Sequence, residues 1–362
     1  MVASISARGN AKAALAYYAH LRADEYYTRG GEPPGRWAGD AAAQLSLQGP
    51  VTQKEFEAAL RGLDPKTGDH LGQHANHDQA AGWDMTFSAP KSVSVLWALS
   101  PAQERPAIEQ AHRAAVLAAT RHLEATAAWA RRGKGGALRE QTAGLLMAQF
   151  DHHTSRESDP QLHTHCFIFN CAPRRDGSWG AIISRDLYKA QKEVGAIYRR
   201  ALGNELERLG HHLDWQKGSF RVAAIPRKVE RAFSKRRQAI EEAARKHGYR
   251  TAKGMERATL RTRQPKKERK LDDLFKDWQA EAEALGFDLK RDRQQTFRQI
   301  PHAERHDKPI TAGRSPSLLS VPSPLASLQL IGQRLGHLLR ALDHPSRMPG
   351  LRLKLRDQER ER

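Results

Sequence analysis

Four tyrosines stand in two adjacent pairs near the start of the chain, Tyr17 with Tyr18 and Tyr26 with Tyr27. Side chains of a core recur three or four apart on a helix or two apart on a strand, and adjacent pairs fit neither spacing. A phenolate is a good nucleophile and a good leaving group, so a tyrosine can form a covalent bond to phosphate and reverse it. The pairs therefore indicate nucleophilic attack on phosphorus; packing of one member of each pair is the plainer alternative.

Four histidines fall within fourteen residues and could assist such a tyrosine. His163 and His165 stand two apart in an apolar run, so their rings are expected to share one face of a strand. His152 or His153, at the end of another apolar run, adds a third imidazole, and the spacing does not decide between these two. Three imidazoles leave coordination positions open for substrate oxygens, as a catalytic metal requires. Ordinary surface or core histidines are the alternative interpretation.

Asp84 is an acid inside the apolar run Trp83 to Ser88. A buried carboxylate is costly unless it has a partner. We therefore expect Asp84 to hold the N–H of a metal-bound histidine or to accept a tyrosine proton. An exposed position on an edge strand is the alternative.

The elements that must position these residues alternate between helices and strands. Strands are predicted at 83–88, 144–150 and 162–171, and helices at 52–60, 101–131, 184–210 and 226–248. Thr52 with Glu55 forms a capping box, Ser184 can cap the third helix, and Pro226 can start the fourth. The few, irregularly placed strands leave a parallel sheet and a sandwiched α+β fold equally open.

The formal net charge of +19 on 362 residues favours a polyanionic partner, nucleic acid or an anionic membrane surface. Its distribution is uneven, because residues 226–270 hold 17 Lys and Arg against 5 Asp and Glu. The Pro- and Ser-rich residues 301–362 hold 11 against 6, and the rest of the chain is nearly neutral. We expect 226–270 to clamp DNA beside the site and the tail to add unspecific attraction.

Several protein classes are excluded by simple patterns. No uninterrupted apolar stretch approaches the length of a membrane span, and the early apolar run is too short for a signal peptide. Two cysteines, Cys166 and Cys171, are too few for a disulfide framework and fit a reducing cytosol. With 39% hydrophobic residues the chain can still bury a sizeable core.

The ordered set of motifs resembles the conjugative relaxases of the MobF (TrwC/TraI-like) family, which belong to the HUH endonucleases. The resemblance rests on the paired tyrosines, on the run Asp84 to Ser94, and on the segment from His152 through Pro160 to His165. Later pieces at 232–240 and 278–286 extend it over about residues 1–295. The set as a whole is highly specific, whereas any single His-x-His would be a weak signal.

This resemblance implies an α+β fold, an HUH-type relaxase fold with a central antiparallel sheet flanked by helices and C-terminal helical fingers over single-stranded DNA. It assigns the nucleophile to Tyr17 and the second catalytic tyrosine, used in the later strand transfer, to Tyr26, with Tyr18 and Tyr27 as secondary tyrosines. The metal ligands it implies are His152, His163 and His165, which selects His152 over His153. Asp84 matches the acid that orients a ligand and assists the tyrosine.

Two departures from the family pattern affect the expectations. Seven residues separate the tyrosine pairs, slightly more than in similar relaxases, so the assignment of Tyr26 is weaker than that of Tyr17. No Gly-x4-Gly-Lys-Ser/Thr occurs, and Gly133 to Gly136 has the wrong spacing and is expected to form a turn. We therefore expect a relaxase domain at 1–298 with a basic finger region at 226–270, then a basic linker and short amphipathic helix at 299–362, and no helicase domain.

The function implied is metal-dependent, strand-specific nicking and rejoining of plasmid transfer-origin DNA through a 5′-phosphotyrosyl link. Mg2+ or Mn2+ is the expected ion, with Zn2+, Ni2+ or Cu2+ able to occupy three imidazoles. Lys91 and Arg156 lie beside the motifs and are candidate phosphate contacts, with ordinary solvated cations as the equal alternative. Expected partners are single-stranded or hairpin origin DNA, relaxosome accessory proteins, a coupling protein and a separate helicase, without membrane insertion.

Other functions remain alternatives at this stage. An HUH replication initiator or transposase would share the chemistry, a metal-dependent hydrolase would use the histidines with water, and a basic DNA-binding regulator would have no activity. The expected location is the bacterial cytoplasm, with transfer into the recipient cell alongside the DNA as a further implication of the family.

Overall fold

The computed structural model describes residues 3–16, 33–72, 80–263 and 269–299, and for residues 252 and 295–299 only the backbone. The chain divides into two compact units, Met1–Lys308 and Pro309–Arg362. The second unit lies wholly outside the described residues. So do the predicted amphipathic helix of the tail and the four paired tyrosines at positions 17, 18, 26 and 27.

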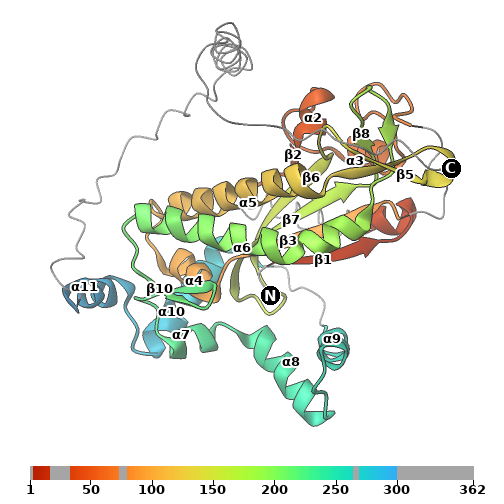
Figure 1. Ribbon diagram of the computed structural model, residues 1–362. Helices are drawn as coiled ribbons and strands as arrows, with labels where there is room; N and C mark the ends of the chain where they lie inside the picture. The colour runs from red at the N-terminus through yellow and green to blue at the C-terminus, as the bar shows by residue number, and fades with distance from the viewer. Residues whose placement is uncertain (1–2, 17–32, 73–79, 264–268, 300–362) are drawn as a thin grey trace, which may run out of the picture. The chain divides into compact units, whose positions relative to one another are not determined.

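A five-stranded sheet forms the centre of the first unit (Figure 1). Its strands lie in the order β1 (Ala3–Arg8), β3 (Gly82–Ser88), β7 (Pro160–Phe169), β6 (Met147–Thr154) and β2 (Arg36–Ala38). Every neighbouring pair is antiparallel. The α+β expectation is confirmed and a parallel sheet is excluded for this unit. Because β3 lies between β1 and β7 and Asp84 is buried, the alternative of an exposed edge-strand position for Asp84 is excluded.

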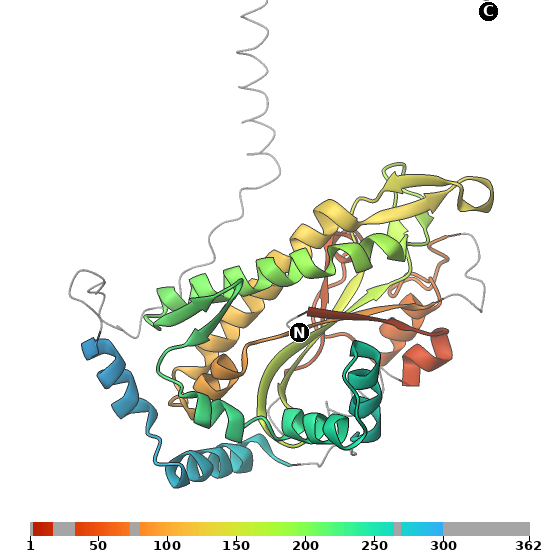
Figure 2. The same cartoon turned by 60° about the horizontal axis from the view of Figure 1, so that its bottom comes forward.

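Helices α4 (Lys91–Leu99), α5 (Arg105–Ala127) and α6 (Ser184–Arg208) build the larger core. Figures 1 and 2 show α5 and α6 lying side by side along one face of the sheet. The side chains that this face contributes alternate along each strand with those of the other face. On β3 they are Trp83, Met85 and Phe87, and all three are buried in this core.

The other face of the sheet is apolar at one end only. There α2 (Asp40–Gln44) and α3 (Gln53–Leu60) supply a second core. The ring of Phe56 packs edge-on against Phe150, Phe167 and Phe169 at centroid distances of 5.0–6.1 Å. The predicted capping box is confirmed, since Thr52 and Glu55 exchange hydrogen bonds at the start of α3.

Small antiparallel pairs complete the strands. They are β4 (Trp129–Arg132) with β5 (Leu138–Gln141), β8 (Ala172–Pro173) with β9 (Trp179–Gly180), and β10 (Leu213–Gln216) with β11 (Ser219–Val222). The helix predicted to end at residue 131 ends at Ala127 instead, because Trp129 to Arg132 pair with β5. The turn of this hairpin is a 3-10 turn, η2 (Lys134–Gly136), in which Gly135 and Gly136 take positive φ. Gly133–Gly136 is therefore a turn, as predicted.

The remaining boundaries differ by a few residues from the predictions. The strand predicted at 144–150 begins at Met147 and continues to Thr154, and the strand predicted at 162–171 spans Pro160–Phe169. Ser184 is the first residue of α6, and the capping position falls on Ile183, which has no side-chain oxygen. Side-chain capping by Ser184 is thus a wrong prediction.

The basic segment contains α7 (Arg227–Ala232), α8 (Lys235–Lys246) and α9 (Ala252–Arg261), followed by α10 (Leu271–Ala284) and α11 (Leu289–Gln299). The single helix predicted at 226–248 is wrong, because the chain breaks between α7 and α8 at Phe233 and Ser234. Phe233 is fully buried in the larger core, which turns the chain at that point. No helix among the described residues is long and apolar enough to cross a membrane.

Candidate active site

Three imidazoles gather on the sheet face that carries the second core, at the end away from Phe167 and Phe169. The ring centroids of His152, His163 and His165 lie 5.2–5.3 Å from one another. His152 of β6 is directly opposite His163 of β7. The two-residue spacing places His165 on the same face as His163, as predicted.

Strand alternation in β6 explains why His152 and not His153 joins this cluster. Ala148 and Phe150 of β6 face the second core and Met147 faces the larger core, so His152 lies on the histidine face and the next residue, His153, points toward α5. Its ring stacks on Trp97 at a centroid distance of 4.8 Å, and its Nε2 lies 3.4 Å from a carboxylate oxygen of Glu109. His152 and His153 therefore lie in different environments, on opposite faces of the sheet.

Asp84 lies beside His165 on the same face. It is 2% exposed, and its carboxylate oxygens lie 3.0 and 3.1 Å from Nδ1 of His165. The guanidinium of Arg8 donates to Asp84 at 2.7 Å, and the hydroxyl of Thr86 lies 3.3 Å from it. The strand register brings these groups together, since Thr86 is opposite His165 and Ser6 is opposite Asp84.

We did not predict a role for Arg8 from the sequence, although the alternation of polar and apolar residues around it indicates a strand. In β1 the polar residues Ser4, Ser6 and Arg8 alternate with Ala3, Ile5 and Ala7, so Arg8 belongs to the polar face of a strand. Arg8 neutralises the buried Asp84 carboxylate from the side opposite His165. The acid can therefore stay ionised under the imidazole.

The three imidazoles suit a metal ion in donor type, in tautomer and in spacing. The carbonyl oxygen of Gln161 can only accept, so the Nδ1 of His163 that lies 2.9 Å away carries the hydrogen, and Nε2 carries the lone pair. The Asp84 carboxylate fixes the same tautomer in His165. Tetrahedral coordination at ordinary metal–nitrogen distances would place ring centres about 5 Å apart, close to the separations seen here.

A bound ion would still require adjustment of the rings. In the described part of the chain no three His, Cys, Asp or Glu side chains already form a closed metal cage. Rotation of imidazoles about their side-chain torsions is the smallest change that would converge three nitrogens, because the strands already hold the rings at the right separation.

A chain of buried polar groups lies behind the histidines, on the α5–α6 face. The hydroxyl of Tyr198 is 2.7 Å from Nδ1 of His112, whose Nε2 is 2.8 Å from the hydroxyl of Thr164. Thr164, between the two histidines of β7, donates to Asp151 at 2.6 Å. Arg36 and Arg113 donate to the same carboxylate at 2.6 and 2.9 Å. These contacts tie β6 and β7 together directly under the histidines.

The protonation states of these hydrogen-bonded groups are consistent with hydrogen-bond donation in one direction, from Tyr198 toward Asp151. Burial lowers the pKa of His112 to about 4, against the attraction of Asp151, so the ring is neutral at pH 7. Although burial opposes it, Arg36 holds the pKa of Asp151 well below its usual range. Burial raises the pKa of Tyr198, which stays a phenol. Tyr198 thus donates to His112, His112 to Thr164, and Thr164 to ionised Asp151.

The two cations predicted beside the motifs have different surroundings. Lys91 is the first residue of α4, and its Nζ donates to the carbonyl of Pro160 at 2.8 Å. Burial lowers the pKa of Lys91 to about 8, with Asp159 opposing the change. Arg156 is half-buried in the turn between β6 and β7. Contact of either residue with DNA stays a prediction, and the buried hydrogen bond of Lys91 favours a structural role.

The predicted tyrosines lie outside the described residues, but the chain leading to the first of them is described. Residues 11–16 are helical, and the side chain of Asn10 accepts the N–H of Ala13 at 3.1 Å. Ala14 is fully buried in the second core, which also contains Phe150 and Phe167 of the sheet face that carries the histidines. The described part of this helix reaches Ala16, the residue before Tyr17.

A family model of TrwC relaxases matches residues 11–285, about three quarters of the chain. The chain belongs to the TrwC relaxase family. Multifunctional conjugation protein TraI of Escherichia coli K12 is 34% identical over 281 residues. The match covers 74% of this chain and 15% of TraI, so the chain spans less than a sixth of the length of these curated relatives.

Solved structures of TrwC agree with this membership. The metal-bound complex of conjugative relaxase TrwC with oriT DNA has a TM-score of 0.72 at 32% identity, covering 79% of this chain and 99% of that one. A copper-bound TrwC complex with oriT DNA has a TM-score of 0.70 at 34% identity, covering 79% of this chain and all of that one. The predicted resemblance to MobF-family relaxases and the predicted fold are thereby confirmed.

Proposed function

We propose that this chain nicks one strand of a plasmid transfer origin and later rejoins it. The observation that carries the proposal is the cluster of His152, His163 and His165 with Asp84 behind His165, on the sheet face against which the helix leading to Tyr17 packs. Membership of the TrwC relaxase family and the oriT complexes of TrwC support it.

His152, His163 and His165 would hold a divalent metal ion, which would neutralise the scissile phosphate and align it for in-line attack. Mg2+ or Mn2+ is the proposed ion in cells. Three imidazoles are softer ligands than Mg2+ prefers, so Zn2+, Ni2+ or Cu2+ can take the site in vitro. Asp84 orients His165 and, through Arg8, keeps its own negative charge.

The tyrosine performs the covalent step. The phenol of Tyr17 loses its proton as its oxygen attacks the phosphorus, the bond from phosphorus to the 3′ oxygen breaks, and that oxygen takes up a proton to leave a free 3′-OH. The 5′ side stays attached as a phosphotyrosine, so the reverse reaction rejoins the strand without another energy source. Tyr26 would serve the later strand transfer, with Tyr18 and Tyr27 in secondary roles.

Residues 226–270 would hold the flanking single-stranded or hairpin DNA, since their net charge of +12 lies outside the nearly neutral body. Lys91 and Arg156 remain the proposed phosphate contacts of the protein body. Accessory relaxosome proteins, a coupling protein and a separate helicase are proposed partners. The proposed location is the cytoplasm, followed by transfer with the DNA.

Two end-labelled forms of a transfer-origin strand test this function. With Mn2+, a 3′-labelled strand should become covalently bound to the protein, whereas a 5′-labelled strand should release a shorter free fragment. A hydrolase that uses activated water would release both fragments. A DNA-binding regulator would shift both strands in a gel and cleave neither.

A further inference from the structure

The turn between β6 and β7, residues 155–159, joins the strand of His152 to the strand of His163. Two hydrogen bonds between Ser155 and the backbone of Asp159 close this turn. The hydroxyl of Ser155 accepts the backbone N–H of Asp159 at 3.2 Å, and the N–H of Ser155 donates to the Asp159 carbonyl at 2.8 Å. The Asp159 side chain is therefore not needed to form the turn. It is nevertheless completely buried.

The Asp159 carboxylate caps a helix that belongs to another part of the fold. It accepts the backbone N–H of Lys235, the first residue of α8, at 2.7 Å and pairs with Nζ of the same lysine at 3.3 Å. The residue at the capping position of α8, Ser234, forms no side-chain cap. A carboxylate at a helix N-terminus stabilises the free N–H groups and the positive end of the dipole.

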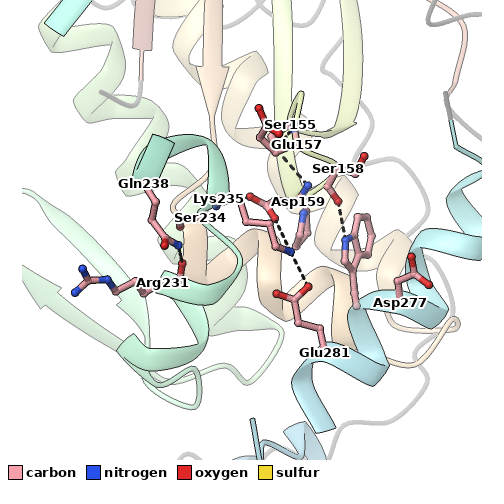
Figure 3. A network of polar contacts seen from close by, with 12 residues as sticks. Ser155, Glu157, Ser158, Asp159, Arg231, Ser234, Lys235, Gln238, Asp277 and Glu281 are labelled. Carbon is pink, nitrogen blue, oxygen red and sulfur yellow. Dashed lines mark hydrogen bonds and ion pairs between the residues drawn. The ribbon is translucent and has the colours of Figure 1, made fainter. Parts of the chain in front are cut away.

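Helix α10 contacts the same turn. The indole of Trp278 donates to the carbonyl of Ser158 at 2.8 Å, and Glu281 accepts from Nζ of Lys235 at 2.7 Å. Figure 3 shows Lys235 between Asp159 and Glu281. Burial raises the pKa of Asp159, and the positive charges of Lys91 and Lys235 oppose that rise, so the ionised acid depends on these cations.

Among the described elements, α8 and α9 pack chiefly against each other. The chain breaks after the buried Phe233, and α8 buries only Ala244. Arg236 ties the two helices to each other through the Thr259 carbonyl at 2.7 Å and the Thr262 hydroxyl at 3.0 Å. We therefore treat α8 and α9 as one rigid unit, whose orientation depends on the contacts at the N-terminus of α8.

We propose that Asp159 is a positioning residue that locks the basic helix pair α8–α9 to the turn between the histidine strands. This proposal of a lock between Asp159 and α8 rests on the proposed function. Its role would be to hold the DNA bound by α8–α9 so that the scissile phosphate lies at the three histidines. Without it, α8–α9 would pivot at Phe233 and Ser234, and bound single-stranded DNA would escape faster.

The test compares Asp159→Asn with Asp159→Glu, which keeps the charge, and with Glu242→Gln, which removes an exposed acid from α8 itself. The release of a fluorescein-labelled oligothymidylate is followed by stopped flow. Asp159→Asn should release it about fivefold to tenfold faster, the size expected for loss of one charged helix cap. Asp159→Glu should recover most of the loss, and Glu242→Gln should match the wild type.

Two further readouts separate a lock from a general loss of structure. Mn2+ affinity and the melting temperature of Asp159→Asn should stay near the wild-type values, while trypsin should cut 236–262 faster in the free protein. Where Asp159→Asn does not fold, Lys235→Gln carries the trypsin test; it removes the Nζ contacts with Asp159 and Glu281 but keeps the backbone cap, so a smaller increase in cleavage is expected. Unchanged DNA release and unchanged trypsin cleavage would overturn the lock. A wild-type protein that binds no oligonucleotide would instead defeat the proposed function.

Discussion

Nδ1 of His165 donates to the carboxylate of Asp84 across two neighbouring strands, at 3.0 Å, while Arg8 holds the same carboxylate from the other side at 2.7 Å. The contact fixes which nitrogen of His165 carries the lone pair. The carboxylate would also stabilise the positive charge that a bound metal ion places on the ring. The metal affinity of the cluster should depend on this acid although Asp84 itself is not a proposed ligand.

Replacing Asp84 by Asn should therefore weaken Mn2+ binding about 10-fold to 100-fold and slow nicking in parallel. The amide can still accept a hydrogen bond, but it carries no charge and leaves Arg8 unbalanced. Calorimetric titration with Mn2+ measures the affinity. Asp69→Asn, in an exposed loop, is the matched control. Equal affinities for the two variants would show that Asp84 does not tune the site.

The neighbours His152 and His153 provide a second test, because they differ in the face of the sheet they occupy. His152→Ala should abolish tight metal binding and leave the metal-free fold intact. His153→Ala should leave metal affinity within about threefold and cost about 2 kcal/mol of unfolding free energy, since it opens a cavity against Trp97. Urea unfolding and metal titration on both variants separate the effects. Loss of metal by His153→Ala would reverse the assignment.

The buried His112 predicts how stability depends on pH. An exposed histidine in the unfolded chain binds a proton near pH 6.5, whereas the folded protein resists protonation of His112 until about pH 4. The stability contributed is complete above pH 6.5 and falls as the pH drops from 6.5 to 4, by up to about 3 kcal/mol. Urea unfolding across this range measures it.

His112→Gln removes this titration and should flatten the decline. Part of the decline should remain, because burial also lowers the pKa of His211, to about 3. His70→Gln, at an exposed position, should keep the wild-type dependence. A His112→Gln variant as steep as the wild type would mean that the ring is already charged at neutral pH.

The basic helices should contribute a measurable share of the salt dependence of DNA binding. Lys246 and Arg257 are exposed on α8 and α9. If each contacts a phosphate, Lys246→Gln with Arg257→Gln should reduce the slope of log Kd against log salt by about 1.4 for a single strand. Arg61→Gln, at the end of α3, should leave the slope unchanged. An unchanged slope in the double variant would show that the DNA phosphates do not contact Lys246 and Arg257.

The parts of the fold predicted correctly are those that local sequence controls. The two-residue spacing of His163 and His165 places both rings on one strand face, and Thr52 with Glu55 caps α3 as the motif predicts. The approximate positions of β3, β6 and β7 follow from apolar runs with turn residues around them. These runs leave a parallel sheet open, and the α+β class comes from the resemblance to the relaxase family.

The features that could not be predicted from the sequence are those that depend on residues far apart in the chain. The helix predicted at 226–248 breaks because Phe233 enters the larger core and Asp159 caps Lys235 from another element. The spacing left His152 and His153 open as alternatives because strand pairing decides between them: His152 is directly opposite His163, so His153 lies on the other face. Arg8 joins Asp84 because β1 pairs with β3, and neither the pairing nor its register can be derived from the spacing of Arg8 alone.

The central claim, that Tyr17 attacks the scissile phosphate, is tested most directly by the covalent adduct with a 3′-labelled transfer-origin strand in Tyr17→Phe and its neighbour Tyr18→Phe. With Mn2+ present, Tyr17→Phe should form no adduct in the first cleavage while still binding the strand, and Tyr18→Phe should form it at close to the wild-type rate. An adduct formed by Tyr17→Phe at the wild-type rate would contradict the assignment.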